Sequence, residues 1–272
     1  MRHLLPSALT RPSSLARQPH VLPRRRLATS GIASMATKAA AAAPGTTRGL
    51  ENPVIFVCDI QEKFRNAIWE FDKVVLTAQK VIKAAQVLSI PIYATTQNRA
   101  RLGATVPELD RLLAAAGPLT REHSDKTRFS MWTPSVQHAL ARDLSSSSTT
   151  TTTTTNTNAN ANAPPPPPPT ASVAIVGIES HICVTQTALD LLRAGHRVHV
   201  LADGVSSCNR EEVPLALARL RAEGAVVTSS EAWLYEVVGD AAAPEFRAIV
   251  GLVKESSSDT AAALRSLHPA KM

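Results

Sequence analysis

The apolar run Val54-Ile55-Phe56-Val57-Cys58, followed at once by Asp59, decides the fold. Five apolar residues without alternation indicate a short strand that is buried on both faces, as in a parallel sheet covered by helices. A charged residue directly after such a strand either begins the loop or serves as an active-site carboxylate. Asp59 is therefore a candidate site residue.

Helical and strand patterns alternate along the rest of the chain. Apolar residues at helical spacing predict a helix over 72–88, and Pro91 opens a strand that runs to Thr96. The other predicted elements are helices over 107–116, 134–141, 182–194 and 211–223, strands over 173–178, 197–202 and 225–228, and two helical pieces after these. This alternation predicts an α/β fold in three layers (α/β/α), with one parallel sheet covered by helices on both faces.

Two segments of unusual composition lie outside the predicted domain. Residues 1–50 are rich in Arg, Ser, Ala and Leu and contain no acidic residue. Residues 145–170 combine Ser, Thr and Asn runs with six consecutive prolines, and such a segment has no apolar set to bury. We predict a disordered leader over 1–50, a disordered insertion over 145–170 within a single domain spanning 51–254, and a flexible tail over 255–272.

The destination of the protein has three interpretations. The leader is typical of a mitochondrial transit peptide, with processing close to Met35. An internal start at Met35 would give a cytosolic form instead. The C-terminal tripeptide Ala270-Lys271-Met272 loosely resembles a peroxisomal signal.

The formal net charge of +7 comes from the leader. Eight of the 29 Lys and Arg residues lie in residues 1–50, so the other 21 face all 22 acidic residues and leave a net charge of −1. A near-neutral domain has no electrostatic surface for a polyanion, so we predict that it binds no nucleic acid. No run of about 18 apolar residues exists, so no membrane-spanning helix is predicted either.

A second candidate site residue follows the strand predicted over 173–178. There Glu179-Ser180-His181-Ile182-Cys183 leads into a helix, and the positive end of a helix dipole favours the thiolate of Cys183. The alternative is that Cys183 is a small buried hydrophobic residue. His181 is the nearest base in sequence, but its two-residue offset points it away from Cys183. Three scattered cysteines without a CxxC pair predict free thiols.

Lys126 is the third candidate, although alone it would be an ordinary surface lysine. If it converges with Asp59 and Cys183, its charge would stabilise the thiolate of a nucleophilic Cys183. Asp59 would take the thiol proton and later serve the attacking water. Backbone N–H groups between Glu179 and Cys183 would form the oxyanion hole.

Three segments in this order resemble the isochorismatase-like cysteine hydrolases: VIFVCDIQEKF (54–64), DKTRFSMW (125–132) and GIESHICV (177–184). Segments 103–109, 177–192 and 199–207 are also similar to the eukaryotic isochorismatase-domain-containing proteins, and the resemblance covers about residues 53–254. It implies a Rossmann-like, six-stranded parallel sheet of order 3-2-1-4-5-6. Strands 1 and 4 would then lie side by side and bring Asp59 to Cys183 at the topological switch point.

The resemblance also implies roles for single residues. It assigns Asp59, Lys126 and Cys183 to a catalytic triad, and the N–H groups of Glu179 and Cys183 to the oxyanion hole. It places a non-proline cis peptide bond between Ile178 and Glu179, with Gln61 and Phe64 near the substrate pocket. It further implies a homo-oligomer.

Differences from better-known members of the family narrow the expected activity. Nicotinamidases hold a metal with an aspartate and histidines after the second strand, whereas residues 95–101 (TTQNRAR) contain no histidine, so we predict no metal and no cofactor. Enzymes that cleave the vinyl ether of isochorismate can lack the cysteine, which this chain retains. We therefore expect a hydrolase that attacks a small amide- or ester-like metabolite, cleaving C–N bonds other than peptide bonds, through a thioester.

Two alternatives remain open from the sequence. One is cysteine-independent hydrolysis of isochorismate. The other is a non-catalytic binding or scaffold protein on the same fold, whose proline run would dock onto an aromatic-lined groove of a partner.

Overall fold

The computed structural model describes residues 49–148 and 169–267 of the chain. The predicted leader up to residue 48, most of the predicted insertion and the C-terminal tripeptide therefore lie outside the described residues. Leu50, which we assigned to the leader, is buried in the hydrophobic core, because an apolar residue next to the first strand packs with it. The domain thus begins earlier than predicted.

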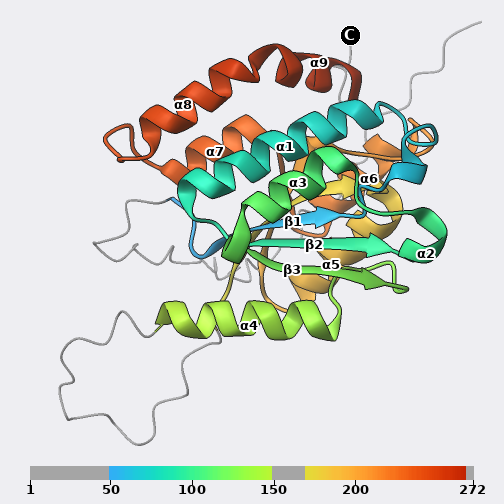
Figure 1. Cartoon of the computed structure of the whole chain (residues 1–272), viewed down its shortest axis with the longest axis horizontal. Coiled ribbons are helices and arrows are strands. Elements are labelled where there is room, and N and C mark those ends of the chain that lie inside the picture. Colours follow the sequence, from blue (N-terminus) through green and yellow to red (C-terminus); the bar gives the residue numbers. More distant parts are fainter. Residues whose placement is uncertain (1–48, 149–168, 268–272) are drawn as a thin grey trace, which may run out of the picture. The chain divides into compact units, whose positions relative to one another are not determined.

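A six-stranded parallel sheet of order β3-β2-β1-β4-β5-β6 forms the middle of the domain, which confirms the predicted fold class (Figure 1). The strands are β1 (Pro53–Cys58), β2 (Ile92–Gln97), β3 (Thr120–Lys126), β4 (Ser172–Ile178), β5 (Arg197–Ser206) and β6 (Val226–Thr228). All six residues of β1 are buried, as expected of a strand that is covered on both faces.

Helices cover the two faces of the sheet through two separate hydrophobic cores. The α-helices are α1 (Phe71–Leu88), α2 (Arg99–Leu102), α3 (Pro107–Ala115), α4 (Pro134–Ser148), α5 (Thr185–Arg193), α6 (Glu212–Ala222), α7 (Ser230–Val238), α8 (Phe246–Glu255) and α9 (Ser257–Leu267). Short 3₁₀ turns occupy η1 (Glu62–Phe64) and η2 (Gly117–Leu119), and a π-helix occupies η4 (Ser180–Val184).

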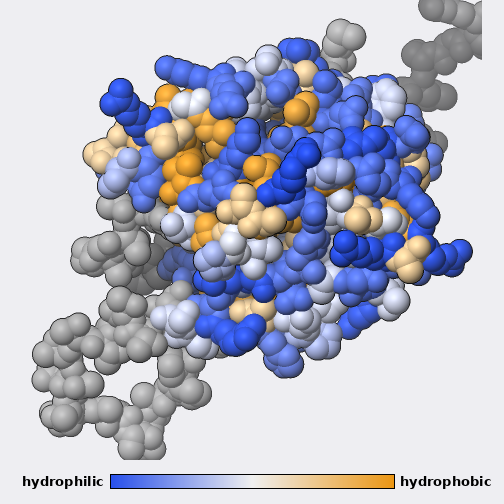
Figure 2. Space-filling model, viewed as in Figure 1, coloured by the Kyte–Doolittle hydropathy of each residue, from blue (hydrophilic) through white to orange (hydrophobic). Residues whose placement is uncertain are grey.

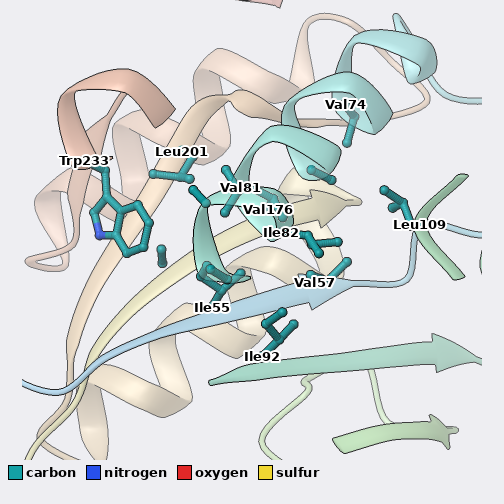
Figure 3. Packing of buried hydrophobic residues seen from close by; sticks show 14 of the residues in the cluster. Ile55, Val57, Val74, Val81, Ile82, Ile92, Leu109, Val176, Leu201 and Trp233 are labelled. Carbon is teal, nitrogen blue, oxygen red and sulfur yellow. The ribbon is translucent and has the colours of Figure 1, made fainter. Parts of the chain in front are cut away.

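Side chains of β1 alternate between the two cores. Ile55 and Val57 pack with α1, α3 and the C-terminal helices α7 to α9, and Figure 3 shows this cluster from close by. Phe56 and Cys58 pack on the opposite face with α4, α5 and α6. The sheet is therefore the middle layer of three, as predicted.

The strand β3 is an element that the sequence patterns did not predict. Its residues, Thr-Arg-Glu-His-Ser-Asp-Lys, contain no apolar run, and only the last of them, Lys126, is buried. An edge strand has one neighbour and needs little apolar surface, which explains the missing signal. In register, Lys126 lies opposite Gln97 at the carboxyl end of β2.

The predicted flexible tail over 255–272 is wrong for residues up to 267. Helix α9 packs against the domain through Thr260, Ala263 and Leu267, whose spacing places them on one face of a helix. Thr260 also accepts a hydrogen bond of 2.6 Å from the buried ammonium group of Lys80 in α1. Residues 268–272 lie outside the described residues.

The predicted insertion starts later than residue 145, because α4 continues to Ser148. The hydroxyls of Ser145 and Ser146 donate to carbonyl oxygens of the preceding turn, those of Ala141 and Asp143. The helix therefore continues into the serine run, although serine has only a modest helix propensity. Residues 149–168 lie outside the described residues.

The face that carries α1, α3 and α4 is mainly hydrophilic, with hydrophobic residues in scattered groups (Figure 2). Within residues 49–148 and 169–267, no helix is both long and apolar enough to cross a membrane.

Candidate active site

The carboxyl ends of β1 to β4 bring the predicted site residues together. Cys58, the last residue of β1, lies opposite Thr95 of β2 and Gly177 of β4 in the sheet register. Asp59 directly follows β1, and Lys126 ends β3. Because parallel strands end at the same edge, these side chains meet beyond that edge.

The carboxylate of Asp59 is held by two side chains and is almost completely buried. Its Oδ1 accepts a hydrogen bond of 2.8 Å from Thr95 Oγ1, and its Oδ2 accepts one of 2.7 Å from Lys126 Nζ. The backbone of Asp59 is left-handed, with φ of 52°, a conformation that aspartate tolerates better than most residues. The carboxylate is thus fixed in position at the end of β1.

The ammonium group of Lys126 has more acceptors than protons. Besides Asp59 it donates to Gln97 Oε1 at 2.7 Å and to the carbonyl oxygens of Arg128 and Phe129 at 3.1 and 2.9 Å. Burial by itself lowers the pKa of Lys126, but the acidic groups of Cys58, Asp59 and Cys183 outweigh burial and raise it above the ordinary value. Lys126 therefore stays positively charged and balances the charge of Asp59.

Cys183 lies in a turn of unusual geometry after β4. The peptide bond between Ile178 and Glu179 is cis, as predicted. The following π-helix, where an α-helix was predicted from residue 182, is marked by the carbonyl of Glu179, which accepts hydrogen bonds from the N–H groups of both Ile182 and Val184. Single π turns occur often at functional sites. The Cys183 side chain itself is buried, and the residue is only 7% exposed.

Gly177 allows this turn to come close to β1. Its φ is 129°, and a Cβ atom at this position would lie 2.1 Å from the carbonyl oxygen of Cys58. No side chain fits there, and a left-handed φ also disfavours residues other than glycine. The close approach of β4 to β1 therefore depends on a glycine at the last position but one of β4.

A second cysteine, Cys58, lies beside the candidate nucleophile. Its Sγ is 3.7 Å from Asp59 Oδ2 and interacts with the side chain of Cys183. Burial, this contact with Cys183 and the charge of Asp59 raise the pKa of the Cys58 thiol well above its ordinary value. Cys58 is therefore a neutral thiol at physiological pH.

A small cavity of about 130 Å³ opens at this place. Asp59, Cys183, Ile178 and Glu179 line it, as does Phe64, which we predicted near the pocket. Gln97, Leu102, Phe129 and Ile182 complete the lining. Cys183 and Asp59 therefore line the same partly open cavity.

Gln61, which we predict near the substrate pocket, is not one of the residues that line the cavity, and its side chain binds backbone groups of two neighbouring segments. Its amide donates to the carbonyls of Gln97 and Gly103 at 3.2 and 2.7 Å, and its Oε1 accepts from the N–H of Gln97 at 2.7 Å. These bonds fix the end of β2 and the residue after α2, the short helix that ends at Leu102. Gln61 thus acts on the cavity indirectly, by holding the segments that carry the lining residues Gln97 and Leu102.

Gln97 is a site residue that the sequence reasoning missed. It ends β2, lines the cavity and links Lys126 Nζ to the carbonyl of Thr127, to which its Nε2 donates at 2.9 Å. The signal was available, because Gln97 follows a buried strand in the same way as Asp59.

Glu179 and His181 form a polar group on the rim. Glu179 Oε2 accepts a hydrogen bond of 2.9 Å from the N–H of Cys208, and His181 Nδ1 lies 3.9 Å from this same oxygen. His181 Nδ1 also shares a hydrogen bond of 3.0 Å with Ser207 Oγ, so it is engaged away from Cys183. Residues 49–148 and 169–267 contain no cluster of three His, Cys, Asp or Glu side chains suited to a metal.

The order of the sheet and the buried polar site at its carboxyl edge define a three-layer α/β protein with an enzyme-like cavity. The sequence model of the Isochorismatase domain matches residues 53–156 and 168–232, well over half of the chain. The chain therefore belongs to the isochorismatase domain family, whose members are isochorismatase-like hydrolases.

Individual relatives agree with this assignment. Isochorismatase domain-containing protein 2 of Bos taurus is 38% identical over 222 residues, which cover 81% of this chain and 93% of the bovine protein. A secreted isochorismatase effector, Isc1, of Phytophthora sojae is 38% identical over 202 residues, or 74% and 84% of the two chains. The solved structure of the MAR1 ribonuclease from Caenorhabditis elegans has a TM-score of 0.60 and 33% identity, covering 75% of this chain and 90% of that one.

Proposed function

We propose that this protein is a cysteine hydrolase that cleaves the C–N or C–O bond of a small amide- or ester-like metabolite. The observation that carries the proposal is that Cys183 and the Asp59 carboxylate line one small cavity, with the charge of Asp59 balanced by the buried Lys126. A nucleophile, a base and a charge that orients the base are the minimum for covalent acyl transfer.

In the first half-reaction, Asp59 takes the proton from the thiol of Cys183 and the thiolate attacks the acyl carbon. A C–S bond forms, and the carbonyl electron pair moves to the oxygen, where the N–H groups of Glu179 and Cys183 would stabilise it. When the carbonyl re-forms, the C–N or C–O bond breaks, and the amine or alcohol leaves with the proton from Asp59.

In the second half-reaction, Asp59 takes a proton from water, and the hydroxide attacks the thioester. The C–S bond breaks, the carboxylic acid leaves, and the thiolate of Cys183 recovers the proton from Asp59. Lys126 donates all its protons to four acceptors, so its part is to hold the Asp59 carboxylate in its orientation.

The experiment is a hydrolysis screen of small amides, ureides and esters with the wild type, Cys183→Ala and Cys208→Ser. We expect turnover by the wild type and by Cys208→Ser, loss of at least about a thousandfold in Cys183→Ala, and an acyl adduct on Cys183 by mass spectrometry. If Cys183→Ala retains turnover of isochorismate, the cysteine-independent reaction is the correct one. If the wild type and Cys183→Ala behave alike on every compound, a binding or scaffold role replaces the proposal.

The name of the Caenorhabditis elegans neighbour makes RNA a useful addition to the screen. The near-neutral charge of residues 51–272 and a cavity of about 130 Å³ speak against an extended polyanion as substrate. We expect no Cys183-dependent cleavage of a short single-stranded RNA.

We also propose that the enzyme is a homo-oligomer. Large apolar side chains remain exposed on helices, among them Leu215 on α6 (66% exposed) and Val87 on α1 (38% exposed). Light scattering coupled to size exclusion tests this proposal, and a monomer at micromolar concentration would contradict it.

A further inference from the structure

We infer that the acyl group accepted by this site is uncharged and largely apolar, with only a few non-hydrogen atoms. The inference rests on the proposed function, and it narrows the substrate to a class. It depends on what lines the cavity around Cys183.

Most of the lining is hydrocarbon. Phe64, Leu102, Phe129, Ile178 and Ile182 contribute apolar side chains from five different segments. Phe129 is half exposed, whereas Ile178 is buried. Such a lining favours an acyl group without polar substituents.

The polar groups of the lining are already engaged by the protein. The amide of Gln97 binds Lys126 and Thr127, the carboxylate of Asp59 binds Thr95 and Lys126, and Glu179 accepts from the N–H of Cys208. A polar substituent on the acyl group would therefore lose its hydration without gaining a free partner from these side chains.

The charges that face the cavity are negative. Asp59 and Glu179 line it, and none of its described lining residues is basic. Lys126 does not line the cavity, and its ammonium group already donates hydrogen bonds to four acceptors, one of which is Asp59. A carboxylate on the acyl group would meet like charges in a partly desolvated space, so anionic substrates are disfavoured.

The volume limits the size of the acyl group. The cavity beside Cys183 has a volume of about 130 Å³. Pockets for drug-sized ligands occupy about 300–1,000 Å³. Isochorismate carries two carboxylates, so its charge disfavours it at this cavity.

Two alkylating reagents of nearly equal shape test the charge selectivity directly. Iodoacetamide is neutral and iodoacetate is anionic, and both alkylate a thiolate with loss of iodide. The rate of modification of Cys183 in the wild type is followed by peptide mass spectrometry at mildly alkaline pH, where imidazoles are neutral. Each rate is divided by the rate at which the same reagent alkylates 2-mercaptoethanol. This normalisation removes the difference in intrinsic reactivity between the two reagents.

We expect the normalised rate with iodoacetate to be at least about tenfold below that with iodoacetamide. Equal normalised rates, or a preference for iodoacetate, overturn the inference. This measurement needs no turnover, so it tests the charge selectivity separately from the proposed function. If Cys183 reacts with neither reagent faster than Cys58 or Cys208, Cys183 is not an activated nucleophile and the proposed function is wrong.

A variant that adds a positive charge to the lining supplies a second measurement. Leu102 ends α2 and is only partly buried, so Leu102→Arg places a cation at the cavity with little effect on the core, and Leu102→Met is the neutral control. We expect Leu102→Arg to raise the iodoacetate-to-iodoacetamide ratio about tenfold over that of Leu102→Met. An unchanged ratio in a folded Leu102→Arg protein contradicts the inference.

Discussion

At the scale of single residues, the position of Asp59 depends on partners from two other strands. Thr95 binds one carboxylate oxygen from β2 and Lys126 binds the other from the end of β3. The carboxylate cannot rotate without losing both hydrogen bonds. Because proton transfer requires a base held within hydrogen-bond reach, Thr95 is a positioning residue for the proposed reaction.

Replacing Thr95 by Val should lower kcat by about tenfold and leave KM nearly unchanged, because one hydrogen bond to a charged group is lost. Thr95→Ser keeps the hydroxyl and should restore most of kcat. Thr96→Val is the matched control, since Thr96 Oγ1 binds Asp125 at 2.9 Å instead of Asp59. Steady-state kinetics on the substrate from the screen measure all three, and equal kcat losses in Thr95→Val and Thr96→Val would contradict the role of Thr95.

The raised pKa of Cys58 predicts how stability depends on pH. A thiol whose pKa rises on folding contributes stability that is fully present below its unfolded pKa and is lost as pH rises through the folded value. The free energy of unfolding should therefore fall above about pH 8.5, by up to ~1.4 kcal/mol per pH unit. Urea denaturation under reducing conditions between about pH 7 and 10 measures the slope. Cys58→Ala should show a shallower slope, and parallel curves would exclude Cys58 as the cause.

At the scale of elements, sequence patterns predict the strands that have continuous apolar runs. They do not predict elements whose structure depends on tertiary contacts. β1, β2 and β4 are recognisable because buried strands need continuous apolar runs. β3 is not, since an edge strand made of Thr, Arg, Glu, His, Ser, Asp and Lys carries no such run. Asp59 and Cys183 are candidates because they follow predicted strands, whereas the role proposed for Lys126 depends on the resemblance, because Lys126 alone is indistinguishable from a surface lysine.

The π-helix after β4 had no signal in the sequence either. Ser180–Val184 has residues that an α-helix also accepts, and the wider turn arises because the carbonyl of Glu179 accepts hydrogen bonds from two N–H groups. The contacts that Gln97 and Thr95 make are also not predictable from sequence patterns. Their partners, Lys126 and Asp59, are at least 29 positions away in sequence, so only the folded sheet brings them together.

Gly177→Ala tests the close approach of β4 to β1. The added Cβ would lie 2.1 Å from the Cys58 carbonyl, so β4 must shift away from β1, and we expect a loss of about 3 kcal/mol or more in the free energy of unfolding. Gly224→Ala is the control, because its φ is also left-handed (100°) but no atom lies within 4 Å. It should cost only about 1 kcal/mol. Similar losses from chemical denaturation of both variants would mean that backbone strain, and not the contact with β1, decides the effect.

Removing α9 tests whether the C-terminal helix belongs to the folded domain. Deletion of residues 257–272 exposes the core surface beneath Ala263 and Leu267 and leaves the Lys80 ammonium without its Thr260 partner. We expect a loss of about 3 kcal/mol or more. Deletion of residues 268–272 alone should change the stability by less than about 0.5 kcal/mol. Thermal denaturation compares the stability of the two truncated proteins. Equal Tm values would mean that α9 adds no stability to the domain, as expected of a flexible tail.

At the scale of the whole molecule, the low-complexity segment joins the domain on the side away from the site. The chain returns from it at the first residue of β4, Ser172, whereas the turn that carries Cys183 follows the last. A strand of seven residues separates these ends by about 20 Å. The Isochorismatase domain match likewise leaves residues 157–167 unmatched.

Replacing residues 149–168 by a Gly/Ser linker of about eight residues should therefore leave kcat/KM within about twofold of the wild type, because loop length has only a weak effect on stability. Kinetics and thermal denaturation of the shortened protein check this. A large loss of kcat/KM in a protein with unchanged Tm would assign the segment a part in catalysis.

The two edges of the sheet have a further consequence for how copies of this chain can associate. β3 is lined with charged and polar side chains along one edge, and β6 has only three residues on the other. Both features discourage the addition of a foreign strand, which is how natural sheets avoid runaway aggregation. Copies of this chain should therefore associate through their helical faces, and a continuous sheet that runs from one copy into the next is not expected.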